Sequence, residues 1–160
     1  MPFSYVEFIT EELAKRGQQY HATETPNFPP PRLTPLRKPI AESTIGVFTS
    51  AGVHLKTEPP LGETNDLSYR LIDRDVPLSE LKFAHMTAVR PWAEQDLNVA
   101  YPRDRLIELE AEGTIGRLAP KAVSMVGSIT RYTELLTEVV PRIESEFERQ
   151  EVDLAFLFPL

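Results

Sequence analysis

VDLAFLFPL, residues 152–160, is a near-continuous apolar run that follows a long amphipathic segment. A run of this length and character predicts a strand buried on both faces, as in a parallel sheet. Chain termini usually lie at the surface, so a chain rarely stops on such a strand. In α/β proteins, ligands and catalytic groups gather beyond the carboxyl ends of the strands. We therefore expect this run to lead directly to the functional site.

Further strands are expected upstream of this run. Residues 45–50 (IGVFTS) are the strongest candidate, and residues 69–72 and 81–86 are weaker ones with short apolar alternations. Together with the helices expected between them, they predict an α/β fold over residues 45–160. We expect a layered sheet that is at least partly parallel, with flanking helices. The apolar ending predicts that this domain is incomplete.

Two helices are expected in the second half of the chain. The first opens at Pro102 and ends at Gly113, which suits the left-handed residue after a helix. The second and longest has Ser128 as its expected N-cap and keeps helical apolar spacing to Phe147. Pro141 should kink it, because proline removes a backbone donor and clashes with the preceding turn.

The first 44 residues form a separate segment in this prediction. A helix is expected over residues 3–17, and six prolines between residues 22 and 41 favour an extended chain. Arg32, Arg37 and Lys38 make this stretch the one basic cluster of the sequence. It is either an arm laid over the domain or a segment that docks a partner or an anionic ligand.

The composition excludes several classes of function. The 160 residues carry 24 acidic and 17 basic side chains, and a net charge of −7 argues against nucleic-acid binding. No apolar stretch has the length of a membrane span, and the N-terminus lacks a signal peptide, so we expect a cytoplasmic protein. There is no cysteine, and His21, His54 and His85 are too far apart for a zinc motif.

Two histidines are the candidates for acid–base chemistry. His54 follows the strand at 45–50, beside Gly52 and a polar loop, where an α/β fold places its site. It is either a proton donor or substrate ligand, or a hydrogen-bonded structural histidine. His85 precedes a polar loop that holds Glu94 and Asp96, and a carboxylate beside an imidazole could orient it.

Four charged residues are candidate substrate ligands. Lys56 and Glu58 follow His54, although a solvated ion pair is the more common role of such loop charges. Arg103 opens the helix at 102–113 and could bind a carboxylate, with surface cover as its alternative. Asp96, in the polar loop, completes the set. No phosphate-binding loop or serine nucleophile elbow is present.

Three stretches resemble a known family. They are FTSAGVHLK at 48–56 with the following Pro59-Pro60, DLNVAYPRDRL at 96–106 and ELEAEGTIG at 108–116. They resemble the selenoprotein B family of glycine, sarcosine, betaine and D-proline reductases, nearest the D-proline reductase-like branch. The resemblance covers roughly residues 45–160.

The resemblance implies an oxidoreductase that reductively cleaves a C–N bond of an amino-acid derivative with a selenolate or thiolate. The family's redox centre follows an FLFPL-like strand, so selenocysteine or cysteine is expected beyond Leu160, and no cofactor within these residues. We hypothesise truncation at an unread selenocysteine codon; a trimmed chain or a short paralogue is the competing explanation, and the DNA sequence past Leu160 distinguishes them. The 160-residue chain alone is then predicted to be inactive.

The resemblance also implies partners. The substrate would be small and amino-acid-like, and a pyruvoyl-bearing partner subunit would activate the amine. His54 becomes a candidate acid or substrate contact, with His85 as a second one. The alternative is a non-catalytic module that binds or assembles a partner subunit. An uncovered apolar face would favour a homo-oligomer.

Overall fold

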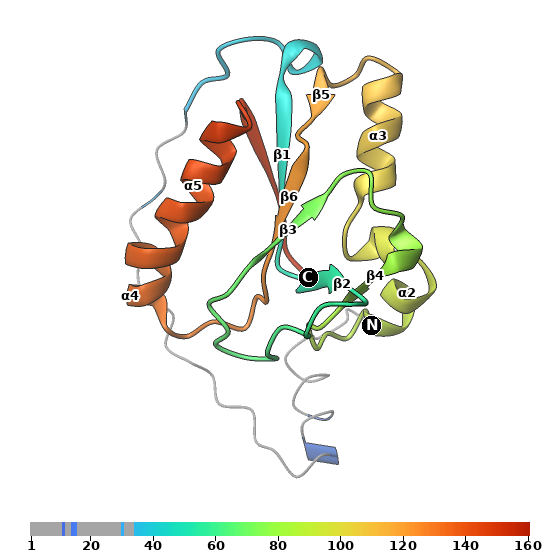
Figure 1. Ribbon diagram of the computed structural model, residues 1–160, viewed down its shortest axis with the longest axis vertical. Helices are drawn as coiled ribbons and strands as arrows, with labels where there is room; N and C mark the ends of the chain where they lie inside the picture. Colours follow the sequence, from blue (N-terminus) through green and yellow to red (C-terminus); the bar gives the residue numbers. More distant parts are fainter. Residues whose placement is uncertain (1–10, 12–13, 16–29, 31–33) are drawn as a thin grey trace.

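Strand β1 (Thr44–Thr49) lies at the centre of the structure, where the sequence predicts its strongest strand. The computed structural model describes residues 11, 14–15, 30 and 34–160 (Figure 1). The helix expected over 3–17 lies almost entirely outside the described residues, as does most of the proline-rich stretch at 22–41.

Parallel strands pair with β1 along both of its edges. β7 (Leu154–Phe158) follows one edge, while β5 (Arg117–Leu118) and β6 (Lys121–Ser124) share the other. β3 (Arg70–Asp73) then pairs antiparallel with β6 and closes that side of the sheet. The sheet is therefore mixed and mostly parallel, and the predicted α/β fold is confirmed.

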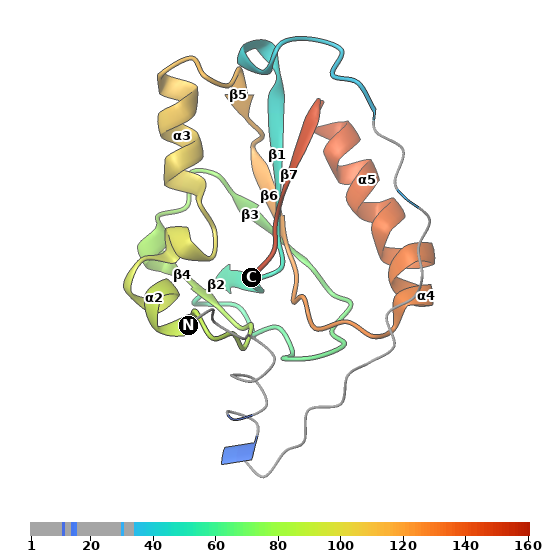
Figure 2. The same cartoon turned by 180° about the vertical axis from the view of Figure 1, so that it is seen from behind.

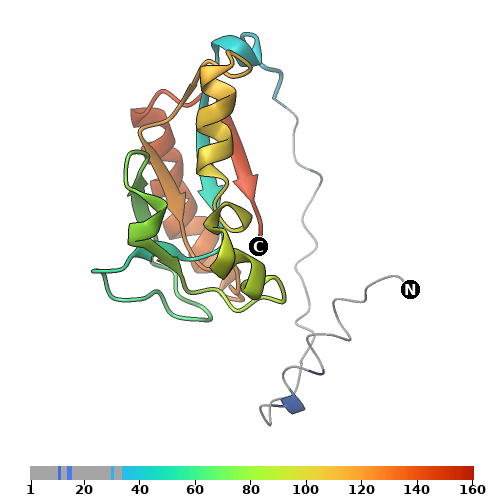
Figure 3. The same ribbon diagram turned by 90° about the vertical axis from the view of Figure 1, so that its right-hand side faces the viewer.

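Helices cover both faces of this sheet. Figure 3 shows α3 (Arg103–Ala111) in front of the sheet and α5 (Val140–Arg149) behind it. Successive residues of β1 alternate between the two layers: Val47 belongs to the cluster under α3, and Phe48 packs on the cluster under α5. Gly46 permits close packing on the α5 side, because a Cβ there would lie 2.8 Å from the methyl carbons of Val152.

The long second helix begins later than expected. Ser128 does not cap it: α4 (Tyr132–Glu134) starts at Tyr132 and continues through a π-helical segment, η4 (Leu135–Val139), into α5. The π-helical turn ends immediately before Val140-Pro141, where proline cannot supply the backbone donor of a regular α-helix. The disturbance predicted at Pro141 therefore takes the form of a widened turn.

A two-stranded ribbon extends from the carboxyl end of β1. β2 (Val53–Leu55) pairs antiparallel with β4 (Leu81–Phe83), which is preceded by the 3-10 turn η2 (Leu78–Glu80). The polar loop that follows folds into α2 (Arg90–Gln95) and the 3-10 turn η3 (Leu97–Val99), neither of which the sequence pattern predicts. Among the described helices, none has both the length and the apolar character to cross a bilayer.

β7 is a parallel strand, but it is not buried on both faces as predicted. It lies at the edge of the sheet beside β1 (Figure 2), and only one of its sides is paired within the described part of the chain. Phe156 and Leu157 are 39% and 65% exposed. Apolar composition identifies the strand correctly, but it does not distinguish an edge strand from a central one.

Candidate functional site

The segment from Thr49 to His54 turns the chain sharply at the carboxyl end of β1. Gly52 has a φ of +66°, and a Cβ at this position would lie 2.8 Å from Cγ1 of Val126. Both the backbone conformation and the space therefore require glycine. This turn starts β2 and sets the position of His54.

Four other parts of the structure converge on this turn, and we call residues 49–52 the hub. It hydrogen-bonds to the ends of β6 and β7, to the residues after β4 and to the segment before α3. These bonds are Gly52 N to Met125 O, Ser50 N to Phe158 O, His85 N to Ala51 O and Thr49 Oγ1 to Ala100 O. The carboxyl edge of the sheet is thus one connected, largely buried unit.

His54 is 1% exposed, and one of its ring nitrogens makes no hydrogen bond to a described residue. Its Nδ1 lies 2.9 Å from the carbonyl oxygen of Gly52, which can only accept, so the hydrogen bond assigns the proton to Nδ1. Nε2 is buried and has no hydrogen-bond partner among the described residues. His54 can therefore accept a hydrogen bond or a proton at Nε2, as a substrate ligand or base would.

Two further buried polar atoms at this edge lack partners within the described chain, Nδ1 of His85 and Oγ of Ser124, the last residue of β6. Burial lowers the pKa of His85, which keeps its imidazole neutral at pH 7. No hydrogen bond joins His85 to His54 or to a carboxylate in the described residues. The carboxylate orientation expected for His85 is therefore absent from this part of the structure.

An open cavity of about 540 Å³ lies between the ribbon and the α2–η3 segment. It brings together Lys56 and Asp96, two of the predicted substrate ligands, and adds Lys82, which pairs with His54 across the ribbon. Apolar side chains also line it, namely Leu78, Leu81, Phe83, Ala93 and Leu97. The sequence alternation Leu81-Lys82-Phe83 could have indicated Lys82, since its side chain must leave the apolar face of the strand.

Among the residues that the structure describes, the charges around the cavity are only partly paired. Arg90 pairs with Glu94 at 2.8 Å, and its guanidinium lies 5.1 Å from the Phe83 ring centroid. Hydrogen bonds from Asn98 hold the pKa of the Asp96 carboxyl below its usual range, so Asp96 is ionised at pH 7. The cavity thus offers ammonium groups, carboxylates and an apolar surface to one ligand.

Glu58 and Arg103 have partners of their own. Glu58 accepts a hydrogen bond from the backbone N–H of Leu55 at 3.0 Å, which closes the turn after β2. Arg103 is 8% exposed, and its guanidinium donates to the carbonyl oxygens of Arg74 and Val76 and pairs with Asp104. These contacts favour structural roles, and the prediction that either residue binds substrate stays a prediction.

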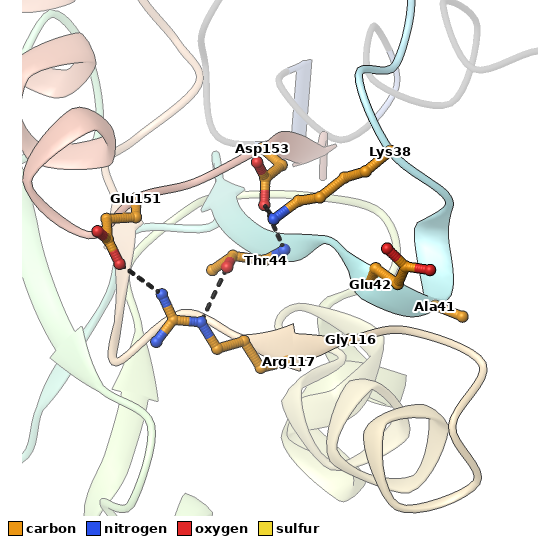
Figure 4. Close-up of a pocket in the computed structure, with 8 residues that line it drawn as sticks. All are labelled: Lys38, Ala41, Glu42, Thr44, Gly116, Arg117, Glu151 and Asp153. Carbon is orange, nitrogen blue, oxygen red and sulfur yellow. Dashed lines mark hydrogen bonds and ion pairs between the residues drawn. The ribbon is translucent and has the colours of Figure 1, made fainter.

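A second open cavity lies at the opposite end of the parallel strands (Figure 4). Lys38 pairs with Asp153 at 2.7 Å, and Arg117 pairs with Glu151 at 3.2 Å. Asp153 also accepts from the backbone N–H of Thr44 at 2.8 Å. These two exposed ion pairs, which we call the clasp, join the starts of β1, β5 and β7, and their charges neutralise one another.

The carboxyl edge is therefore the candidate site. That edge holds the buried, unpartnered imidazole nitrogens and adjoins a cavity with charged groups of both signs. No group of three His, Asp or Glu side chains suited to a metal ion occurs in the residues that the structure describes. The arrangement suits binding and proton transfer to a small polar molecule.

Comparison with known proteins is consistent with the quoted motifs. The chain is 29% identical over 132 residues to the D-proline reductase subunit gamma of Acetoanaerobium sticklandii. The match covers 82% of this chain, and the chain spans about half (54%) of the length of that relative. No family model and no solved structure matches the chain. The predicted resemblance is thereby confirmed at modest identity: the chain is similar to a D-proline reductase subunit.

Proposed function

We propose that this chain forms part of a reductase that cleaves a C–N bond in a small amino acid, with D-proline as the first candidate. The observation that carries the proposal is the buried, unpartnered Nε2 of His54 at the carboxyl edge of the sheet. The relationship to the D-proline reductase subunit supports the reaction class. A pyruvoyl-bearing partner subunit that activates the amine belongs to the same proposal.

The reaction needs a nucleophile that these residues do not supply. The 160 residues contain no cysteine, so the selenolate or thiolate would have to come from outside them. Such a group would supply the nucleophile and the electrons when present. Overall, the C–N bond breaks, carbon and nitrogen each gain a hydrogen, and an external dithiol is oxidised to a disulfide. D-proline would open to 5-aminopentanoate.

The chain's own residues would bind the substrate and handle protons. Lys56 and Lys82 line one wall of the cavity and suit the substrate carboxylate, because ammonium groups form charge-assisted hydrogen bonds with it. The ionised Asp96 suits the amino group. His54, opposite Lys82 in the ribbon, does not line this cavity, and its buried Nε2 would exchange a proton with the substrate once binding opens a path to it.

A second candidate function is assembly of the complex without a part in catalysis. The observation that favours it is β7, an edge strand with apolar side chains exposed at Phe156 and Leu157. Exposed edges of this kind accept another strand, from a partner subunit or from a second copy of the chain. In that case His54 would be structural.

The test is His54→Asn in the reductase assembly purified through a tag on this chain. Asparagine can keep the hydrogen bond to Gly52 O and removes Nε2. We expect the dithiol-dependent rate of 5-aminopentanoate formation from D-proline to fall about 100-fold or more. Arg117→Gln, in the clasp, is the matched control and should retain the rate.

Two results would contradict the proposal. An unchanged rate in His54→Asn, with the assembly intact by size-exclusion chromatography, would favour the assembly function. Turnover by the purified 160-residue chain alone would show that no outside nucleophile is required.

A further inference from the structure

A side-chain hydroxyl holds the backbone directly after β7. Leu160 N–H donates to Oγ of Ser50 at 2.9 Å, and Ser50 N–H donates to the carbonyl oxygen of Phe158 at 3.1 Å. The second bond continues the parallel ladder between β1 and β7, and the first replaces the ladder where the strand ends. One serine therefore fixes two successive points of the chain.

The Ser50 side chain packs closely against Gly127. Gly127 follows β6, and a Cβ there would lie 3.1 Å from both Cβ and Oγ of Ser50. That distance is tighter than ordinary van der Waals contact, so a side chain at position 127 would displace the Ser50 hydroxyl from its present position. Ser50 is thus held between the residues after β6 and those after β7.

Ser50 also connects the end of β7 to both parts of the candidate site. It belongs to the hub, four residues before His54. The side chain of Leu160 packs on the buried cluster that includes Ala93, and Leu97 packs on the same cluster; Ala93 and Leu97 line the cavity beside α2. A shift of Ser50 would therefore move the end of β7 relative to His54 and to the cavity.

We propose that Ser50 is a positioning residue, which sets the backbone after β7 in a fixed relation to His54 through the bond to Leu160 N–H. This inference rests on the proposed function, because it matters for catalysis only if chemistry occurs at the carboxyl edge. The geometric part can be tested on the 160-residue chain without any reductase activity.

The test is amide hydrogen exchange at Leu160, measured by NMR. Ser50→Ala removes the acceptor, and we expect exchange at Leu160 to accelerate about five- to tenfold. Ser50→Thr keeps a hydroxyl and should restore most of the protection. Gly127→Ala leaves Ser50 intact but displaces its hydroxyl, so it should also accelerate exchange at Leu160.

Ser145→Ala is the matched control. The Ser145 hydroxyl donates to Pro141 O on the exposed side of α5, at the same 2.9 Å, so this hydrogen bond lies within one helix. Unchanged exchange in Ser50→Ala would overturn the proposal, and so would a loss in Ser50→Thr as large as that in Ser50→Ala. If Ser50→Ala does not fold, Gly127→Ala provides the same test.

The reductase assay separates this inference from the proposed function. If exchange changes as expected and His54→Asn leaves the reductase rate unaffected, the positioning role stands and the catalytic assignment fails. If exchange does not change, the positioning role fails whatever the assay gives.

Discussion

The two ends of the parallel strands are stabilised by different interactions. At their starts, the clasp joins charged side chains that keep contact with water, from 84% exposed at Glu151 and 48% at Arg117 to 39% at Lys38 and 27% at Asp153. At their carboxyl ends, the hub joins buried groups, with Thr49 and Ala51 both at 0% exposure. Both ends connect β1 to β7, yet only the second excludes solvent.

This difference predicts which end tolerates change. Exposed ion pairs contribute little to stability, because water screens the charges and both side chains lose freedom. Removing one partner from a buried hydrogen bond costs more, because the remaining group is left without water or a partner. A functional site that needs fixed geometry is therefore better supported by the hub than by the clasp.

The largest expected effect comes from Gly52→Ala in the hub. The positive φ costs a non-glycine residue about 1–2 kcal/mol, and the overlap with Val126 adds about 1–3 kcal/mol. We expect the free energy of unfolding in urea to fall by about 2–5 kcal/mol. Far-UV circular dichroism measures the transition.

Gly113→Ala is the matched control for that variant. Gly113 also has a positive φ, +74°, but a Cβ there meets nothing within 4 Å. The free energy of unfolding of Gly113→Ala should fall by about 1 kcal/mol, from backbone conformation alone. Equal losses in the two variants would mean that the packing against Val126 is unimportant.

An intermediate effect is expected from Thr49→Val. Valine has nearly the same shape, but it removes the hydroxyl that donates to Ala100 O at 2.8 Å and accepts from Ala51 N–H at 3.2 Å. Both backbone groups stay buried, so the free energy of unfolding should fall by about 1–3 kcal/mol.

Thr137→Val provides the corresponding change on an exposed helix surface. Its hydroxyl donates to Thr133 O at 2.9 Å, and solvent can replace that bond. The loss should be below about 0.5 kcal/mol. If Thr137→Val costs as much as Thr49→Val, burial does not distinguish the hub.

The sequence predicts the elements whose residues carry their own signal. The strand at β1 and the helix ending at Gly113 were found because their apolar periodicity and stop residue are local. β6 was missed, although it lies between β1 and β3, because Lys121–Ser124 is too short to show a period. Its burial comes from the strands that pair with it.

The start of the long helix shows the same limit. Ser128 has the side chain of an N-cap, but Oδ1 of Asn65 accepts from the backbone N–H groups of Thr130 and Arg131. This contact spans 65 residues of sequence and binds the amides that precede Tyr132. A contact supplied by a distant loop leaves no local pattern.

Some residues of the candidate site could be selected from the sequence, and others only from the structure. Lys56 and Asp96, which the sequence selected, line one cavity, whereas Lys82 and Ser50 became candidates only through pairing and hydrogen bonds. Arg103 was expected at a helix start and is there, but its guanidinium is committed to carbonyl oxygens. Sequence patterns give residue types and spacing, and partners depend on the fold.

The smallest effect is expected from Asp153→Asn in the clasp. The hydrogen bond from Lys38, and then that from Thr44 N–H, hold the pKa of the Asp153 carboxyl below its usual range. Because the pKa is lower in the folded state, the ionised carboxyl stabilises the protein at pH values above the unfolded-state pKa of about 3.9. This stabilisation is lost as the pH falls through the folded-state pKa. Asparagine can keep the Thr44 bond but not the charge.

Urea midpoints at pH 7 and at pH 3 measure this contribution. The difference in urea midpoint between the wild type and Asp153→Asn should be present at pH 7 and smaller at pH 3. It should also be smaller at high salt, because salt screens the charge of Lys38. At pH 7 it should be smaller than that of Thr49→Val. A difference that grew as the pH fell, or that exceeded the effect of Thr49→Val, would make the clasp the stronger end. The proposed site would then lie at the less firmly held end of the sheet, and the hub would not be the part of the structure that best fixes its geometry.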